Sequence, residues 1–81
     1  MRITWEDGAK ASFRSSVMRD QDGAVAVIAA IDALADNPYP GPPAGFHRGE
    51  YNRLRVGLYR VSYYVTGDVI SIDRVDKAAE T

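Results

Sequence analysis

Four arginines and one histidine lie between positions 47 and 60, a segment in which Glu50 is the only acidic residue. Arg53 and Arg55 are two positions apart, so both side chains leave the same face of an extended strand. Arg60 continues the alternation after a turn. A guanidinium stays charged at any biological pH and presents a planar fork of donors that fits phosphate oxygens. The three arginines are therefore candidates for binding a polyanion and for stabilising charge that develops on a phosphoryl group.

The residues around these arginines alternate in polarity as two neighbouring strands would. Tyr51, Ser62 and Tyr64 share the arginine side, where the two tyrosines are candidates for stacking on RNA bases. Tyrosine is also a good strand former, so it is weaker evidence than arginine. The expected opposite side holds Asn52, Leu54, Val56, Tyr59, Val61, Tyr63 and Val65.

A solvent-facing sheet that uses arginine only for solubility is the alternative interpretation. The clustering argues against it, because three arginines within eight residues on one face repel each other unless an anion or an acidic chain is present. The segment 47–60 has a net charge of +3 in a chain whose net charge is −1. Such a distribution favours one specific anionic target, or an acidic partner, over general nucleic-acid binding.

Other ionisable residues near this face are weaker candidates. His47 titrates near neutrality, but a lone histidine in a loop rich in proline and glycine is more often uninvolved. Glu50 is either a base or an ion-pair partner of Arg48. Lys77, expected just past the last strand, belongs either to the basic face or to a tail. Asp73 is expected beside the arginines, where it would neutralise one of them.

The composition predicts a single soluble, cytoplasmic domain over residues 1–81. The chain is 46% hydrophobic, as in globular proteins. It has no cysteine, which excludes disulfides and thiolate metal sites, and its single histidine argues against a histidine-rich metal site. No apolar run approaches the roughly 18 residues of a membrane span, and the first residues lack the pattern of a secretion signal.

The spacing of apolar residues predicts six elements. A strand over residues 2–6 precedes a helix over 7–19, with Asp7 as its N-cap. A second helix starts near Asp20 and ends at Asn37-Pro38. Its expected buried stripe is Ala24, Val27, Ile28, Ile31, Leu34 and Ala35.

Three further strands are expected over residues 51–56, 58–66 and 69–75, joined by turns at Gly57 and at Gly67. The resulting order, β-α-α-β-β-β, predicts an α+β domain. Two N-terminal helices would pack on one face of a small, largely antiparallel four-stranded sheet.

Several of these segments together resemble the RelE/ParE toxin superfamily of prokaryotic toxin–antitoxin pairs. The likeness includes Ile3-Thr4-Trp5, Asn37-Pro38, His47-Arg48-Gly49 and the run from Tyr51 to Tyr63, and it spans almost the whole chain. The stretch RLRVGLYRV within that run is its most specific part. The resemblance implies the two-helix, four-strand fold. For RelE-type members it also implies an endoribonuclease, free of metal and cofactor, that cuts messenger RNA in the ribosomal A site.

In that resemblance Arg53, Arg55 and Arg60 match the catalytic basic positions, and Arg48 matches an RNA-binding one. Together with Tyr51, Tyr64 and Lys77, Arg48 forms the expected RNA-binding set. The sequence departs from the RelE pattern after the last strand, where Ala78 replaces an arginine and no tyrosine follows. Two alternatives therefore stay open: a non-catalytic ParE-like toxin that binds DNA gyrase, and a weakly toxic or inactive RelE homologue. In each case the expected protein partner is a cognate acidic antitoxin, and no membrane is involved.

Overall fold

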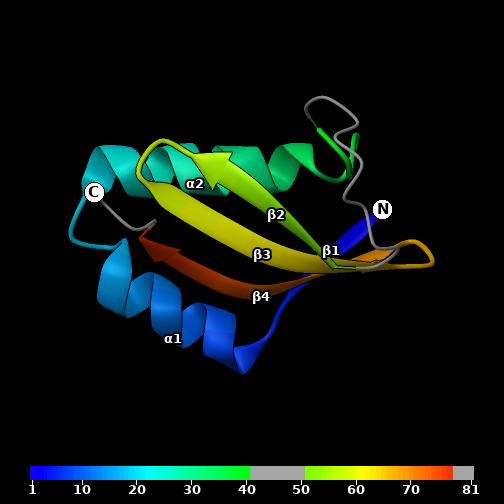
Figure 1. Ribbon diagram of the computed structural model, residues 1–81, viewed down its shortest axis with the longest axis horizontal. Coiled ribbons are helices and arrows are strands. Elements are labelled where there is room, and N and C mark those ends of the chain that lie inside the picture. The colour runs from blue at the N-terminus through cyan, green and yellow to red at the C-terminus, as the bar shows by residue number, and fades with distance from the viewer. Residues whose placement is uncertain (41–50, 78–81) are drawn as a thin grey trace.

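The computed structural model describes residues 1–40 and 51–77, which form one helical layer on one four-stranded sheet (Figure 1). The strand order is β1-β4-β3-β2, with β1 parallel to β4 and the other two pairs antiparallel. The elements are β1 (Arg2–Trp5), α1 (Asp7–Ser16), α2 (Gln21–Ala33), β2 (Tyr51–Val56), β3 (Tyr59–Thr66) and β4 (Val69–Lys77). The predicted α+β class and order of elements are confirmed.

Both helices cover the same face of the sheet. Figure 1 shows α2 behind β2 and β3, and α1 alongside β4. Burial of each large aliphatic side chain in the shared core contributes about 1.5–3 kcal/mol. The core residues, each at most 5% exposed, are Ala9, Val17, Val27, Ile31, Leu34, Tyr59, Val61, Tyr63, Ile70, Ile72 and Val75. Neither of the two described helices covers the opposite face of the sheet.

The start of α1 differs from the prediction. Glu6 is the N-cap and makes no side-chain capping hydrogen bond, so the prediction that Asp7 caps the helix was wrong. Asp7 is instead the first helical residue, where a negative charge is favourable beside the free N–H groups. The helix also ends at Ser16, because the N–H groups of Val17 and Met18 both bond to the carbonyl of Phe13 and close a turn.

The second helix begins where the sequence predicts. Asp20 is its N-cap, and its carboxylate accepts a hydrogen bond from the N–H of Gly23. The buried stripe is narrower than expected: Val27, Ile31 and Leu34 are buried, whereas Ile28 is 40% exposed. The prediction was wrong for Ile28, because a single sheet face touches only one line of residues along α2. None of the helices in the described ranges is long and apolar enough to cross a membrane.

Candidate functional site

The pairing of β2 with β3 brings the predicted arginines together. Arg55 lies directly opposite Arg60, and Arg53 lies directly opposite Ser62. Residues opposite each other in a sheet share a face, so the shared face predicted for the three arginines is confirmed. Tyr59 and Val61, on the other face, are buried.

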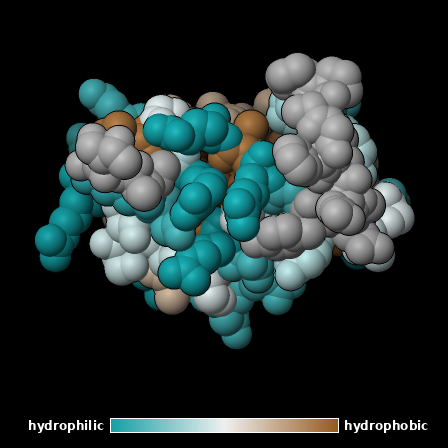
Figure 2. Space-filling model, in the orientation of Figure 1, coloured by the Kyte–Doolittle hydropathy of each residue, from teal (hydrophilic) through white to brown (hydrophobic). Residues whose placement is uncertain are grey.

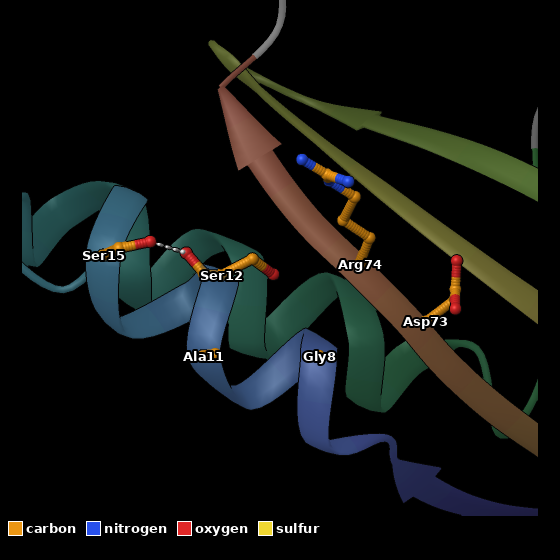
Figure 3. Close-up of a pocket in the computed structure, with 6 residues that line it drawn as sticks. All are labelled: Gly8, Ala11, Ser12, Ser15, Asp73 and Arg74. Carbon is orange, nitrogen blue, oxygen red and sulfur yellow. Dashed lines mark hydrogen bonds between the residues drawn. The ribbon is translucent and has the colours of Figure 1, made fainter.

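A fourth arginine reaches this face from β4. The pairing of β3 with β4 shifts at Ser62/Tyr63, where Ser62 pairs with Arg74 and the next residue, Tyr63, pairs with Ile72. Asp73 is thus the extra residue of a β-bulge, a feature that interrupts the alternation of side chains. Figure 3 shows Asp73 and Arg74 extending from the same side of β4.

The sequence analysis missed Arg74 because strict alternation assigns it to the buried side with Ile70 and Ile72. The signal that would have found it is the spacing of the buried residues of β4. Ile70 and Ile72 are two apart, but the next buried residue, Val75, follows after three. An extra residue in an antiparallel strand produces this change of spacing.

We call the cluster of Arg53, Arg55, Arg60 and Arg74 the arginine face. Its residues come from three adjacent strands, and it lies on the side of the sheet opposite the two helices. Figure 2 shows hydrophilic side chains gathered over β2, β3 and β4 in this view. The arrangement suits an extended anion better than a small enclosed ligand.

One carboxylate, that of Asp76, pairs with two of these guanidiniums. Its Oδ1 lies 3.5 Å from Nε of Arg60, and its Oδ2 lies 3.1 Å from Nε of Arg74. Asp73, which the sequence placed in this role, makes no ion pair with any residue in the described ranges, so that prediction was wrong. The bulge moves the neutralising position along β4, because Asp76 rather than Asp73 pairs with Arg60 in the sheet register.

In three of the four arginines, the Nε atom is the one that contacts another group of the protein. Arg55 donates from Nε to the carbonyl of Gly57 at 2.7 Å, and Arg60 and Arg74 face Asp76 through Nε. No hydrogen bond within the described part of the chain occupies their terminal Nη groups. Since a guanidinium has five N–H donors, each keeps the paired Nη donors that a phosphate accepts.

Of the remaining residues predicted for the site, the structure describes some and not others. Tyr64 is 40% exposed on the arginine side, and its backbone lies opposite that of Tyr51. Lys77 is the last residue of β4 and pairs with Tyr59, so the prediction that it follows the strand was wrong. Arg48 and the side chain of Tyr51 lie outside the described residues, and so do His47 and Glu50.

A groove of about 570 Å³ between α1 and β4 adjoins the arginine face. Among the described strands, none lies beside this edge of β4 beyond the end of β1, and Ser12 accepts a hydrogen bond from the N–H of Val75 there. Arg74 belongs to both the groove and the arginine face. The lining residues, drawn in Figure 3, are Gly8, Ala11, Ser12, Ser15, Asp73 and Arg74.

Comparison with known proteins identifies this architecture. No family model and no curated protein matches the sequence. Solved structures match it over nearly its whole length. A chain of the chromosomal ParDE toxin–antitoxin system from P. aeruginosa superposes with a TM-score of 0.72 at 17% identity, covering 98% of this chain and 97% of that one. The chain has the RelE/ParE toxin fold.

Two further structures agree with this identification. A chain of the intact RelBE toxin–antitoxin complex of E. coli gives a TM-score of 0.74 at 13% identity, with 98% of each chain covered. The isolated RelE toxin of E. coli gives 0.71 at 14% identity, covering 99% of this chain and 86% of that one. At such identities the likeness establishes the RelE/ParE fold, which the stretch RLRVGLYRV had predicted.

Proposed function

We propose that this protein is the cytoplasmic toxin of a toxin–antitoxin pair and that it cleaves messenger RNA on the ribosome. The observation that carries the proposal is the arginine face: four guanidiniums from three strands on one open side of the sheet. The isolated RelE toxin and the RelBE toxin–antitoxin complex, both of E. coli, support it through their shared fold. The cognate antitoxin would be an acidic protein that neutralises this face.

The chemistry would be attack of an RNA 2′-hydroxyl oxygen on the adjacent phosphorus. The P–O5′ bond breaks, the 2′-hydroxyl proton is transferred in net to the leaving 5′-oxygen, and a 2′,3′-cyclic phosphate remains. Arg55 and Arg60, opposite each other and held through Nε, would stabilise the charge that grows on the non-bridging oxygens. Loss of one such donor typically costs about 10²–10³-fold in rate.

The sequence differs from the RelE pattern at a residue of the acid–base half of the reaction. The RelE pattern has an arginine where this sequence has Ala78. A positioned general acid or base usually contributes about 10²–10⁴-fold. We therefore propose a nuclease slower than members with the complete pattern.

The second candidate is a ParE-like toxin that binds DNA gyrase. Ala78 favours it, because a non-catalytic toxin does not need the missing arginine, and the ParDE structure has the same fold. The arginine face favours the nuclease, because four guanidiniums facing solvent match a phosphate backbone. A weakly toxic or inactive RelE homologue is the third candidate.

Toeprinting on translated messages, run beside a gyrase supercoiling assay, separates these candidates. We expect wild-type protein to truncate messages within the A-site codon and to leave supercoiling unchanged. The R55A and R60A variants should lose truncation, whereas R14A, which removes an exposed arginine from α1, should retain it. Inhibited supercoiling with intact message would replace this proposal with the gyrase alternative. No effect in either assay would indicate the inactive homologue.

A further inference from the structure

We infer that the arginine face binds two consecutive phosphates of one RNA strand. One phosphate lies between Arg55 and Arg60, and the next lies between Arg53 and Arg74. The inference rests on the proposed function, and it adds both a geometry and a residue, Arg74, for which the sequence analysis gave no role. The RNA backbone then runs along the direction of β3.

The sheet register divides the four arginines into two rows. In the first row, Arg55 on β2 lies opposite Arg60 on β3, which pairs in turn with Asp76 on β4. In the second row, Ser62 on β3 lies opposite Arg53 on β2 and also pairs with Arg74 on β4. Each row therefore supplies two guanidiniums, one from either side of a place where a phosphate can bind.

The distance between the rows matches an extended nucleic acid. Arg60 and Ser62 are two residues apart on one strand, which corresponds to about 6.5–7 Å at the usual rise of a β-strand. Consecutive phosphates of an extended single strand have a similar separation. A phosphate centred over each row would thus meet two guanidiniums without bending the RNA backbone.

A small residue lies at the centre of the second row. Ser62 has no long side chain of its own to fill the position between Arg53 and Arg74, and it is only 5% exposed because atoms of other residues cover it. Arg53 and Arg74 are separated by two strand spacings, about 9–10 Å between backbones. The side chains of Arg53 and Arg74 are long enough to reach one phosphate from both sides. An arginine at the position of Ser62 would instead occupy the place of the phosphate.

Asp76 connects the two rows. It pairs with Arg60 of the first row and with Arg74 of the second, in both cases through Nε. The side chain of Arg74 is 65% exposed and that of Arg60 is 40% exposed. Both guanidiniums are therefore oriented by the protein and still open to a ligand. The groove beside Arg74 leaves room for the nucleoside that follows the second phosphate (Figure 3).

A short RNA with two phosphates tests the inference. The probe is a 2′-O-methyl trinucleotide, which cannot be cleaved, in three forms: both phosphates charged, or one or the other replaced by a neutral methylphosphonate. Binding to the full chain is followed by NMR titration at low ionic strength. With the charged probe, each of R53A, R55A, R60A and R74A should weaken binding about tenfold or more. The matched control R14A should bind as wild type does.

The neutral probes assign each row to its phosphate. Neutralising the first-row phosphate should remove the effect of R55A and R60A and leave that of R53A and R74A, and the other neutral probe should do the reverse. Each face variant should also reduce the slope of log affinity against log salt by about 0.7. R14A should not change this slope.

Three results would overturn the inference. They are tight binding by R74A, equal effects of all four variants with both neutral probes, and no binding of the trinucleotide by wild-type protein. Toeprinting keeps these outcomes distinct from failure of the proposed function. If wild type cuts message while R74A behaves as R14A does, only the inference fails. If wild type cuts no message, the proposed function itself fails.

Discussion

The hydroxyl of Tyr59 donates a 2.9 Å hydrogen bond to Oδ2 of Asp20, the residue that caps α2. The other oxygen, Oδ1, accepts from the N–H of Gly23 at 3.0 Å. One carboxylate therefore caps a helix and joins it to β3. Because Tyr59 directly precedes Arg60 and lies on the opposite face of the strand, this contact holds α2 against the back of the arginine face.

The hydrogen bonds to Asp20 make the free energy of unfolding depend on pH in the acid range. The Gly23 N–H, and then the Tyr59 hydroxyl, lower the pKa of Asp20 from its ordinary value of 3.8. A carboxyl group whose pKa is lower in the folded state contributes stability above its unfolded pKa. That contribution is lost as pH falls through the folded value.

We therefore expect the free energy of unfolding of wild-type protein to fall below about pH 4 more steeply than that of D20N. Asparagine also caps helices well, so the comparison isolates the titrating charge. Urea denaturation at a series of pH values measures it. Parallel curves for the two proteins would show that Asp20 contributes no pH dependence.

Two helical glycines should respond in opposite directions to alanine. A Cβ at Gly23 would lie 2.5 Å from Oδ2 of Asp20, the capping carboxylate, and 2.6 Å from Cε2 of Tyr59. At Gly8 the nearest atom, the carbonyl oxygen of Asp73, is 3.8 Å away. Thermal denaturation should show that G8A is more stable than wild type by about 0.4–1 kcal/mol, whereas G23A is less stable. Stabilisation of both would mean that the contact around Tyr59 is loose.

A hydrogen bond from β4 to the hydroxyl of one serine, Ser12, stabilises the edge of this strand. Ser12 accepts a 3.0 Å hydrogen bond from the N–H of Val75, a fully buried residue. S12A leaves that N–H without its partner, so we expect a loss of about 1–3 kcal/mol. S15A is the control, since the Ser15 hydroxyl is exposed and only donates to the carbonyl of Ser12. Equal unfolding free energies for S12A and S15A in urea would contradict this role.

The sequence predicted the fold and three of the four residues of the arginine face for one reason. Alternation along β2 and β3 is local, so the shared face of Arg53, Arg55 and Arg60 follows from their spacing alone. The place of Arg74 depends on a bulge, which forms only when β4 pairs with β3. The exposure of Ile28 likewise depends on how α2 meets the sheet. Both features arise from packing between elements rather than from the pattern within one.

Replacing Asp76 changes two properties of the arginine face, its net charge and the positions of its guanidiniums. Its replacement by alanine makes the face more positive, which by itself favours binding of any polyanion. The same change removes the acceptor that holds Arg60 and Arg74 through Nε. Small displacements of positioning groups can cost about 10²-fold in rate. We therefore expect D76A to bind heparin at least as tightly as wild type, yet to cleave ribosome-bound message at least about tenfold more slowly.

The matched control for D76A is D68A, which removes one negative charge from the exposed turn between β3 and β4. Heparin binding and toeprinting rates are measured on the same preparations of both variants. If charge alone matters, D76A and D68A will both cleave at or above the wild-type rate, and Asp76 will have no positioning role. A slower rate in D76A alone would show that the carboxylate orders the guanidiniums, because a simple gain of positive charge cannot produce tighter polyanion binding and slower cleavage together.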